Sequence, residues 1–171
     1  MADFKHLIRD VPDFPKKGII FKDITPLLKD PKAFQGVIQH LVDRYKGKKI
    51  DGIVAMESRG FIFGGALATH LGVSFIPVRK PGKLPWKTIQ ETYDLEYGKD
   101  TLEIHQDSVS KGDKLLVLDD VLATGGTAAA TIRLVERAGG EVAEACFLIH
   151  LTFLNGQQKL KSTPHYSIIQ Y

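Results

Sequence analysis

Cysteine is nearly absent from the 171 residues of this chain, because Cys146 is the only one. A single cysteine cannot pair within the chain, so a disulfide scaffold is excluded. No apolar run reaches the roughly 20 residues that span a bilayer. Charged side chains also interrupt the first residues, where a signal peptide would carry its apolar stretch. We therefore expect a soluble, cytoplasmic protein with no membrane partner.

A strong excess of charge of one sign is also lacking, since the net charge is only +3. Domains that bind nucleic acids usually carry a dense basic stripe, whereas the cations here mostly alternate with acidic residues. We therefore expect no nucleic-acid partner. One short segment, 79–87, contains four cations and no acid. Such a segment is typical of a solvated loop or of a site for a small polyanion.

The remaining composition is ordinary for a globular protein, with 43% hydrophobic and 25% charged residues. This composition excludes collagen, coiled coils and general disorder. The length predicts a single domain over 1–171 that buries roughly two thirds of its unfolded surface.

Four apolar, β-branched runs predict strands, and a short run near the end of the sequence is a candidate fifth. Because these runs show little alternation, they are typical of strands that are buried on both faces of a parallel sheet. They cover 50–56, 73–79, 114–121, 142–150 and 167–171.

Helical patterns accompany these runs. Asp30 followed by Pro31 is a typical helix start, and apolar residues then recur at helical spacing as far as Val42. Two further helices are expected over 59–71 and 127–138, the second of which precedes a pair of glycines. The order of strands and helices predicts an α/β fold with a doubly wound parallel sheet flanked by helices.

Two regions depart from this alternation. Residues 86–110 form a long connection with a candidate hairpin, and connections of this length in compact domains are usually functional lids or disordered. The first 30 residues precede the sheet, and we expect them to form an arm or hood over one end of it.

The segment 115–127, LLVLDDVLATGGT, is the strongest candidate for a binding site. Ligands of open parallel sheets bind at the carboxyl ends of the strands, and here Asp119 and Asp120 end a strand ahead of a glycine-rich loop. The glycines let the loop amides converge, and the helix that follows contributes unpaired amides at its positive end. These features predict a phosphate cradle, with two acids placed to bind the vicinal hydroxyls of an attached sugar.

Competing motifs are absent from the sequence. It contains no G-x-x-x-x-G-K-[ST] and no G-x-G-x-x-G after a strand, which argues against a P-loop nucleotide hydrolase and against a nicotinamide cofactor. The six histidines do not have the spacing of metal ligands. No pair of nucleophile and base indicates covalent catalysis.

LLVLDDVLATGGT resembles the phosphoribosyl-diphosphate (PRPP) binding motif of type I phosphoribosyltransferases. From about residue 13 to 171 the chain is similar to the adenine-using family of these enzymes. The matching segments are DFPKKGIIFKDITPLLKD, ESRGFIFG, VRKPGKLP, YDLEYG, LEIH and SIIQY. The first motif is common to the superfamily, whereas GIIFKDITPLLKD and KLP with YDLEYG are specific to the family.

The resemblance implies a type I phosphoribosyltransferase fold with a small N-terminal hood (1–30) and a mobile catalytic loop (86–110). It implies transfer of ribose 5-phosphate from PRPP to adenine, which gives AMP and diphosphate in purine salvage. It also implies a homodimer that uses Mg²⁺, with the metal held mainly by PRPP and water and not directly by protein ligands.

The resemblance further implies how PRPP binds. Asp119 and Asp120 are expected to hold the ribose hydroxyls. The 5-phosphate loop is expected to comprise Ala123, Thr124, Gly125, Gly126 and Thr127. The diphosphate is expected to contact Ser58, Arg59, Gly60, Arg79, Lys80 and Lys83. Cations are suited to this site because arginine offers a rigid fork of donors to phosphate.

Catalysis is expected to involve Arg59 together with Glu96 and Tyr97 of YDLEYG, which align with the acid and the aromatic residue of the family's loop. A lid that excludes water would protect a ribose with oxocarbenium character. Glu96 is the candidate for handling the ring proton of the purine. We assign Glu103, in LEIH, a structural role.

The adenine site is expected on the N-terminal arm. Ile20, Phe21 and Lys22 align with base-binding residues of the family, with Phe21 stacking on the base, and Leu151 would cover its other face. Lys22 stands where the family often has arginine, so no single residue specifies adenine over a 6-oxopurine. Two alternatives therefore stay open, namely a phosphoribosyltransferase for hypoxanthine, guanine or xanthine, and a PRPP-sensing regulator without catalysis.

Overall fold

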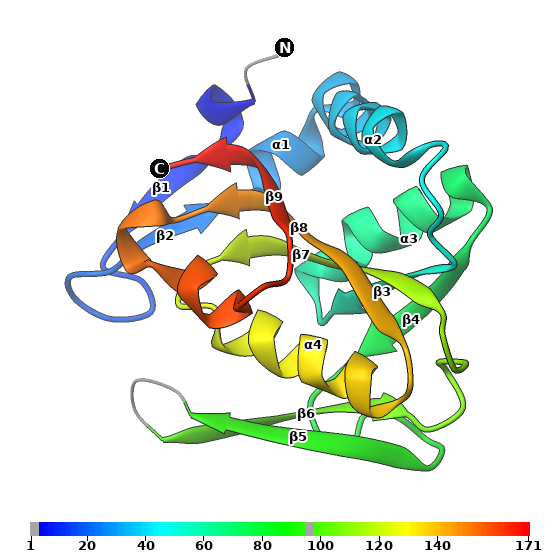
Figure 1. Ribbon diagram of the computed structural model, residues 1–171. Helices are drawn as coiled ribbons and strands as arrows, with labels where there is room; N and C mark the ends of the chain where they lie inside the picture. The colour runs from blue at the N-terminus through cyan, green and yellow to red at the C-terminus, as the bar shows by residue number, and fades with distance from the viewer. Residues whose placement is uncertain (1–3, 95–97) are drawn as a thin grey trace. The chain divides into compact units, whose positions relative to one another are not determined.

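The computed structural model describes residues 4–94 and 98–171 (Figure 1). The chain divides into two compact units, Met1–Arg44 and Tyr45–Tyr171, and each is described by itself. Within the described residues, none of the helices combines the length and the apolar character needed to cross a bilayer.

The first unit contains a β-hairpin and two α-helices. Its elements are a 3-10 helix (Lys5–Leu7), β1 (Arg9–Pro12), β2 (Ile20–Asp23), α1 (Thr25–Lys29) and α2 (Pro31–Tyr45). Strands β1 and β2 pair antiparallel. The Asp30 carboxylate accepts hydrogen bonds from the backbone N–H groups of Lys32 and Ala33, at 2.9 and 3.1 Å. Because Asp30 caps α2 in this way, the helix start predicted at Asp30 and Pro31 is confirmed.

The second unit is built on a parallel sheet of five strands in the order β4-β3-β7-β8-β9. The strands are β3 (Gly52–Met56), β4 (Ser74–Val78), β7 (Lys114–Leu122), β8 (Glu141–His150) and β9 (His165–Gln170). All five predicted strands are present, with ends within two residues of those predicted. All five residues of β3 are buried, which explains why its sequence does not alternate.

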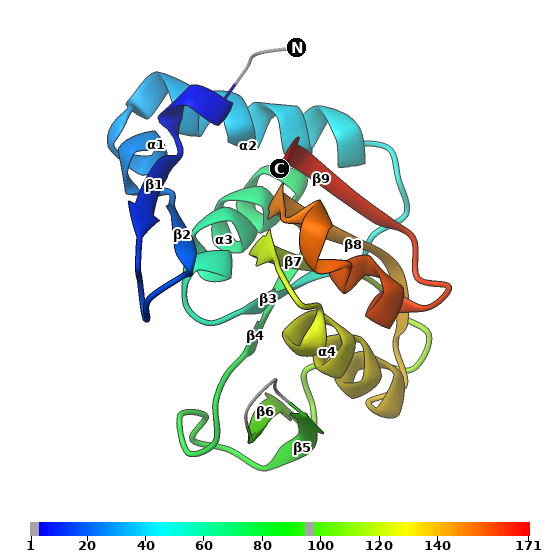
Figure 2. The same ribbon diagram turned by 90° about the vertical axis from the view of Figure 1, so that its left-hand side faces the viewer.

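Two helices cover opposite faces of this sheet. Helix α3 (Arg59–Leu71) leads from β3 outward to β4, and α4 (Gly126–Arg137) leads from β7 to β8 in the opposite direction along the sheet. Because crossovers between parallel strands are right-handed, the opposite directions place the helices on opposite faces, as the two views show (Figures 1 and 2). The predicted doubly wound arrangement is therefore confirmed, with α4 starting one residue earlier than expected.

The long connection after β4 contains the predicted hairpin. Strands β5 (Thr88–Asp94) and β6 (Lys99–His105) pair antiparallel. The hairpin packs against α4 (Figure 1). Glu91 joins the two elements, because its carboxylate oxygens lie 2.6 Å from Arg133 Nε and 2.8 Å from an Arg137 guanidinium nitrogen.

Replacing Glu91 with glutamine tests this attachment. The hydrogen bond from Arg133 lowers the pKa of Glu91 below its usual 4.5. Burial acts in the opposite direction, and the hydrogen bond from Arg137 lowers the pKa further. The carboxylate therefore stabilises the fold above pH 4.5, and this stabilisation is lost as the pH falls through the lowered pKa. We expect Glu91→Gln to reduce the free energy of unfolding by about 1 kcal/mol near neutral pH and by less in acid. Urea unfolding across this pH range measures the difference.

Glu136→Gln is the matched control. Glu136 is exposed on α4, the helix that carries Arg133 and Arg137, and it forms no ion pair within the described residues. We expect it to change the free energy of unfolding little at any pH. Equal losses in the two variants, or a Glu91→Gln loss that does not decline in acid, would contradict the assigned role of the carboxylate.

Candidate active site

The carboxyl end of β7 places two acidic side chains next to each other. The Asp119 carboxylate accepts a hydrogen bond of 2.9 Å from the backbone N–H of Asp120. Asp120 is only 5% exposed, and its Oδ2 lies 2.7 Å from Arg59 Nε, as an ion pair whose angles fall outside those of a hydrogen bond. The structure therefore brings the predicted ribose-binding acids into contact with the start of α3.

Burial raises the pKa of both acids, and the charge of Asp120 raises that of Asp119 further. The Arg59 guanidinium acts in the opposite direction at both carboxyl groups. Two adjacent acids in a poorly solvated position gain from partners that donate hydrogen bonds. The hydroxyls of a sugar are such partners, so the electrostatics suit the predicted role.

A small concave site follows these acids at the junction of β7 and α4. It has a volume of about 80 Å³. Its lining residues are Asp119, Val121, Leu122, Ala123, Thr124, Gly125, Gly126, Thr127 and Ala128. The first amides of a helix have no partners within the helix, and α4 begins at Gly126, inside this lining. The structure thus brings the whole predicted 5-phosphate loop to one concave site with a helix N-terminus.

The loop is held in place by a contact with Gly156, which the sequence reasoning missed. Gly125 has a φ of +77°, and a Cβ atom there would lie 2.2 Å from the Gly156 carbonyl oxygen. A Cβ on Gly156 would in turn lie 2.1 Å from the Ala123 carbonyl oxygen. Two backbones therefore approach where no side chain fits. The only signal in the sequence was the turn-forming pair Asn155-Gly156.

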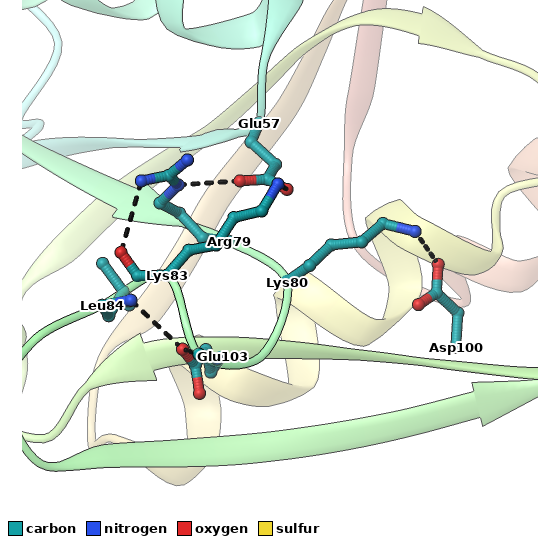
Figure 3. Close-up of polar contacts among 8 residues, drawn as sticks. Glu57, Arg79, Lys80, Lys83, Leu84, Asp100 and Glu103 are labelled. Carbon is teal, nitrogen blue, oxygen red and sulfur yellow. Dashed lines mark hydrogen bonds and ion pairs between the residues drawn. The ribbon is translucent and has the colours of Figure 1, made fainter.

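The cations of the diphosphate-binding prediction are paired with carboxylates (Figure 3). Glu57 accepts hydrogen bonds from Arg79 Nε at 2.7 Å and from Lys83 Nζ at 2.8 Å. Although burial opposes it, these two cations lower the pKa of Glu57. Lys80 Nζ donates to Asp100 at 2.6 Å, and this bond lowers the pKa of Asp100 against the effect of burial. Carboxylates of the protein thus neutralise the positive charges of Arg79, Lys80 and Lys83.

Glu103 holds the backbone of this basic segment through hydrogen bonds (Figure 3). It is 2% exposed and accepts hydrogen bonds from the backbone N–H groups of Gly82 and Leu84, at 3.0 and 3.4 Å. The side chains of Thr88 and Gln90 donate to its other oxygen, at 3.1 and 3.2 Å. With four donors around a buried carboxylate, Glu103 has the structural role assigned to it from the sequence.

The remaining residues predicted to bind the diphosphate are Ser58, Arg59 and Gly60, which lie at the start of α3. Ser58 precedes α3 directly, and Arg59 and Gly60 are the first two residues of that helix. The peptide bond between Glu57 and Ser58 is cis. The predicted diphosphate loop lies between the end of β3 and the start of α3, and Arg59 is paired with Asp120.

The predicted base-binding residues lie in different units. Ile20, Phe21 and Lys22 are in β2 of the first unit, and Leu151 directly follows β8 in the second. Lys22 Nζ lies 2.6 Å from an Asp10 carboxylate oxygen. The adenine pocket that would join these residues stays a prediction.

The predicted catalytic residues Glu96 and Tyr97 lie outside the described residues. Their assigned roles also stay predictions.

Comparison with known proteins identifies the family of the chain. A family model described as the phosphoribosyl transferase domain matches residues 23–170. The adenine phosphoribosyltransferase of Trichlorobacter lovleyi is 55% identical over the full length of both chains. That of Thermosipho melanesiensis is 57% identical and covers 99% of this chain and 97% of its own.

Solved structures give the same result. The adenine phosphoribosyltransferase of Thermoanaerobacter pseudethanolicus superposes with a TM-score of 0.96 at 54% identity, covering 98% of each chain. The Saccharomyces cerevisiae enzyme, solved with adenine and an imino-altritol bisphosphate, has a TM-score of 0.90 at 42% identity and covers 96% of this chain and 95% of its own. The chain therefore belongs to the phosphoribosyltransferase family, and its full-length relatives place it among the adenine phosphoribosyltransferases.

Replacing Gly156 with alanine tests whether this residue shapes the phosphate loop. Overpacking a tight contact costs about 1–3 kcal/mol, and the strain here falls on the loop. We expect Gly156→Ala to weaken PRPP binding by about tenfold, which corresponds to about 1.4 kcal/mol. Isothermal titration calorimetry with PRPP measures this effect.

Gly65→Ala is the control, because a Cβ at Gly65 of α3 has open space around it. Alanine is favoured over glycine in a helix by about 1 kcal/mol, so this variant should be at least as stable as the wild type. PRPP affinity that is unchanged in a folded Gly156→Ala variant would refute the assigned role of Gly156.

Proposed function

We propose that this chain transfers the 5-phosphoribosyl group of PRPP to adenine and releases AMP and diphosphate. The observation that carries the proposal is the arrangement near the end of β7, where a half-buried acid, Asp119, and a buried acid, Asp120, adjoin a concave loop at the N-terminus of α4. This arrangement can bind a sugar phosphate through both its hydroxyls and its phosphate. Full-length similarity to adenine phosphoribosyltransferases supports the choice of base.

The 5-phosphate would bind to the loop amides and the hydroxyls of Thr124 and Thr127, while Asp119 and Asp120 accept hydrogen bonds from the ribose hydroxyls. A related enzyme from Trypanosoma brucei, 27% identical with a TM-score of 0.91, was solved with AMP, pyrophosphate and ribose 5-phosphate. We extend these ligand classes to the present chain.

The diphosphate would bind between Ser58–Gly60 and the basic segment. Here Arg79 and Lys83 would exchange Glu57 for phosphate oxygens, and Lys80 would exchange Asp100. An incoming diphosphate carries more charge than either carboxylate, so it competes effectively for the same cations. Arg59, next to Asp120, would contact the diphosphate where it separates from the ribose.

We propose that Mg²⁺ takes part, held mainly by PRPP and water. Mg²⁺ favours hard oxygen ligands and usually keeps several waters, so Asp119 and Asp120 could accept hydrogen bonds from those waters without being direct ligands. Bound to the diphosphate, Mg²⁺ would neutralise charge on the leaving group. The homodimer and the cytoplasmic location implied by the family resemblance belong to the same proposal, as does the absence of nucleic-acid and membrane partners.

A panel of bases tests the proposed reaction. The purified protein is mixed with PRPP and Mg²⁺, and adenine, hypoxanthine, guanine, xanthine, uracil or orotate is added separately. We expect AMP from adenine and no nucleotide from the other bases, measured by chromatography. A nucleotide from another purine would instead support the 6-oxopurine alternative. Saturable PRPP binding without any product would support the regulator.

Replacing Glu96 with glutamine tests the proposed proton transfer to or from the purine. General acid–base catalysis contributes roughly 10²–10⁴-fold to a rate. We therefore expect Glu96→Gln to lower kcat by about 10²-fold or more, while the affinity for PRPP stays close to that of the wild type. Steady-state kinetics and calorimetry separate the two effects. Glu136→Gln, at an exposed position of α4, is the control, and a kcat equal to wild type in Glu96→Gln would exclude the role.

A further inference from the structure

Tyr93 contacts the N-terminus of α4 from the neighbouring hairpin. It lies in β5 and is only 7% exposed. Its hydroxyl is 3.1 Å from Thr127 Oγ1. Its ring packs against Gly126, where an added Cβ would lie 3.2 Å from the ring. The phosphate loop therefore has a buried aromatic side chain on its outer side.

The same hydroxyl has a second partner. It lies 3.4 Å from Asp100 Oδ2, which in turn accepts the 2.6 Å hydrogen bond from Lys80 (Figure 3 shows the Lys80–Asp100 bond). Lys80, Asp100, Tyr93 and Thr127 thus form a continuous chain of polar contacts. This chain joins the basic segment, the hairpin and the phosphate loop.

The direction of the hydrogen bonds in this chain depends on what Thr127 binds. A hydroxyl carries one proton and can accept two hydrogen bonds. When Tyr93 donates to Asp100, Thr127 must donate to Tyr93. When Thr127 donates to a phosphate, which in its dianionic form can only accept, Tyr93 must donate to Thr127. Burial raises the pKa of Tyr93, so its hydroxyl retains the proton that this arrangement requires.

We propose that Tyr93 is a positioning residue for the 5-phosphate. It donates a hydrogen bond to Thr127 Oγ1 and thereby orients the Thr127 hydroxyl toward the phosphate. This inference rests on the proposed function, because it assumes that the loop binds a sugar phosphate. A donor behind the Thr127 hydroxyl also strengthens the bond that this hydroxyl makes. Neither Tyr93 nor its bond to Thr127 follows from the PRPP motif.

Tyr93→Phe removes the hydroxyl and keeps the ring against Gly126. We expect it to weaken binding of ribose 5-phosphate roughly fivefold, the effect of one hydrogen bond, and to leave the affinity for diphosphate unchanged. Calorimetry with each ligand alone measures both values. Tyr45→Phe is the matched control, because Tyr45 is also buried and donates a 2.7 Å hydrogen bond to Glu144. It should change neither affinity.

A double-mutant cycle with Thr127→Val makes the test specific. In the Thr127→Val background, Tyr93→Phe should have no further effect on ribose 5-phosphate binding, whereas additive losses would overturn the proposal. Unchanged ribose 5-phosphate affinity in Tyr93→Phe, or equal losses for ribose 5-phosphate and diphosphate, would overturn it as well. If the wild-type protein fails to bind ribose 5-phosphate, the proposed function itself fails, which is a separate outcome.

Discussion

The placement of two adjacent carboxyl groups, one half-buried and one buried, near the end of the central strand is the constraint on which the rest of the site depends. Charged groups are costly to bury unless they are paired or hydrogen-bonded. Hydrogen bonds from backbone N–H groups and the ion pair with Arg59 offset this cost in part for Asp119 and Asp120. The start of α3 is thereby tied to the end of β7, and the carboxyl ends of two neighbouring strands carry groups of opposite charge.

The cations of the neighbouring basic segment are paired with carboxylates in the same way as Arg59. Glu57 comes two residues earlier and is paired with Arg79 and Lys83, while Lys80 is paired with Asp100. Each cation of the proposed diphosphate site therefore has a carboxylate partner within the protein. Such pairing keeps the basic segment ordered when no ligand is bound, because the cations would otherwise repel one another. In the proposed function, diphosphate binding would therefore be an exchange of partners and not a simple addition of charge.

Features that depend on local sequence could be predicted, whereas contacts between distant segments could not. The strands were recognisable because burial on both faces produces unbroken apolar runs, and the phosphate loop because its acids, glycines and threonines are contiguous. Gly156 escaped prediction because its role is set by Gly125, which lies far from it in the sequence. Tyr93 escaped for the same reason, since nothing around it in the sequence indicates a contact with Thr127.

The two phosphate sites differ in a way that fits the proposed reaction. The proposed 5-phosphate site consists of backbone amides and hydroxyls, and it is confined by the Gly125–Gly156 contact and by Tyr93. The proposed diphosphate site consists of long cationic side chains that have alternative partners in Glu57 and Asp100. In the proposed transfer the 5-phosphate stays attached to the ribose throughout, whereas the diphosphate must leave. A rigid site suits the group that stays, and carboxylates that compete for the same cations assist the departure of the group that leaves.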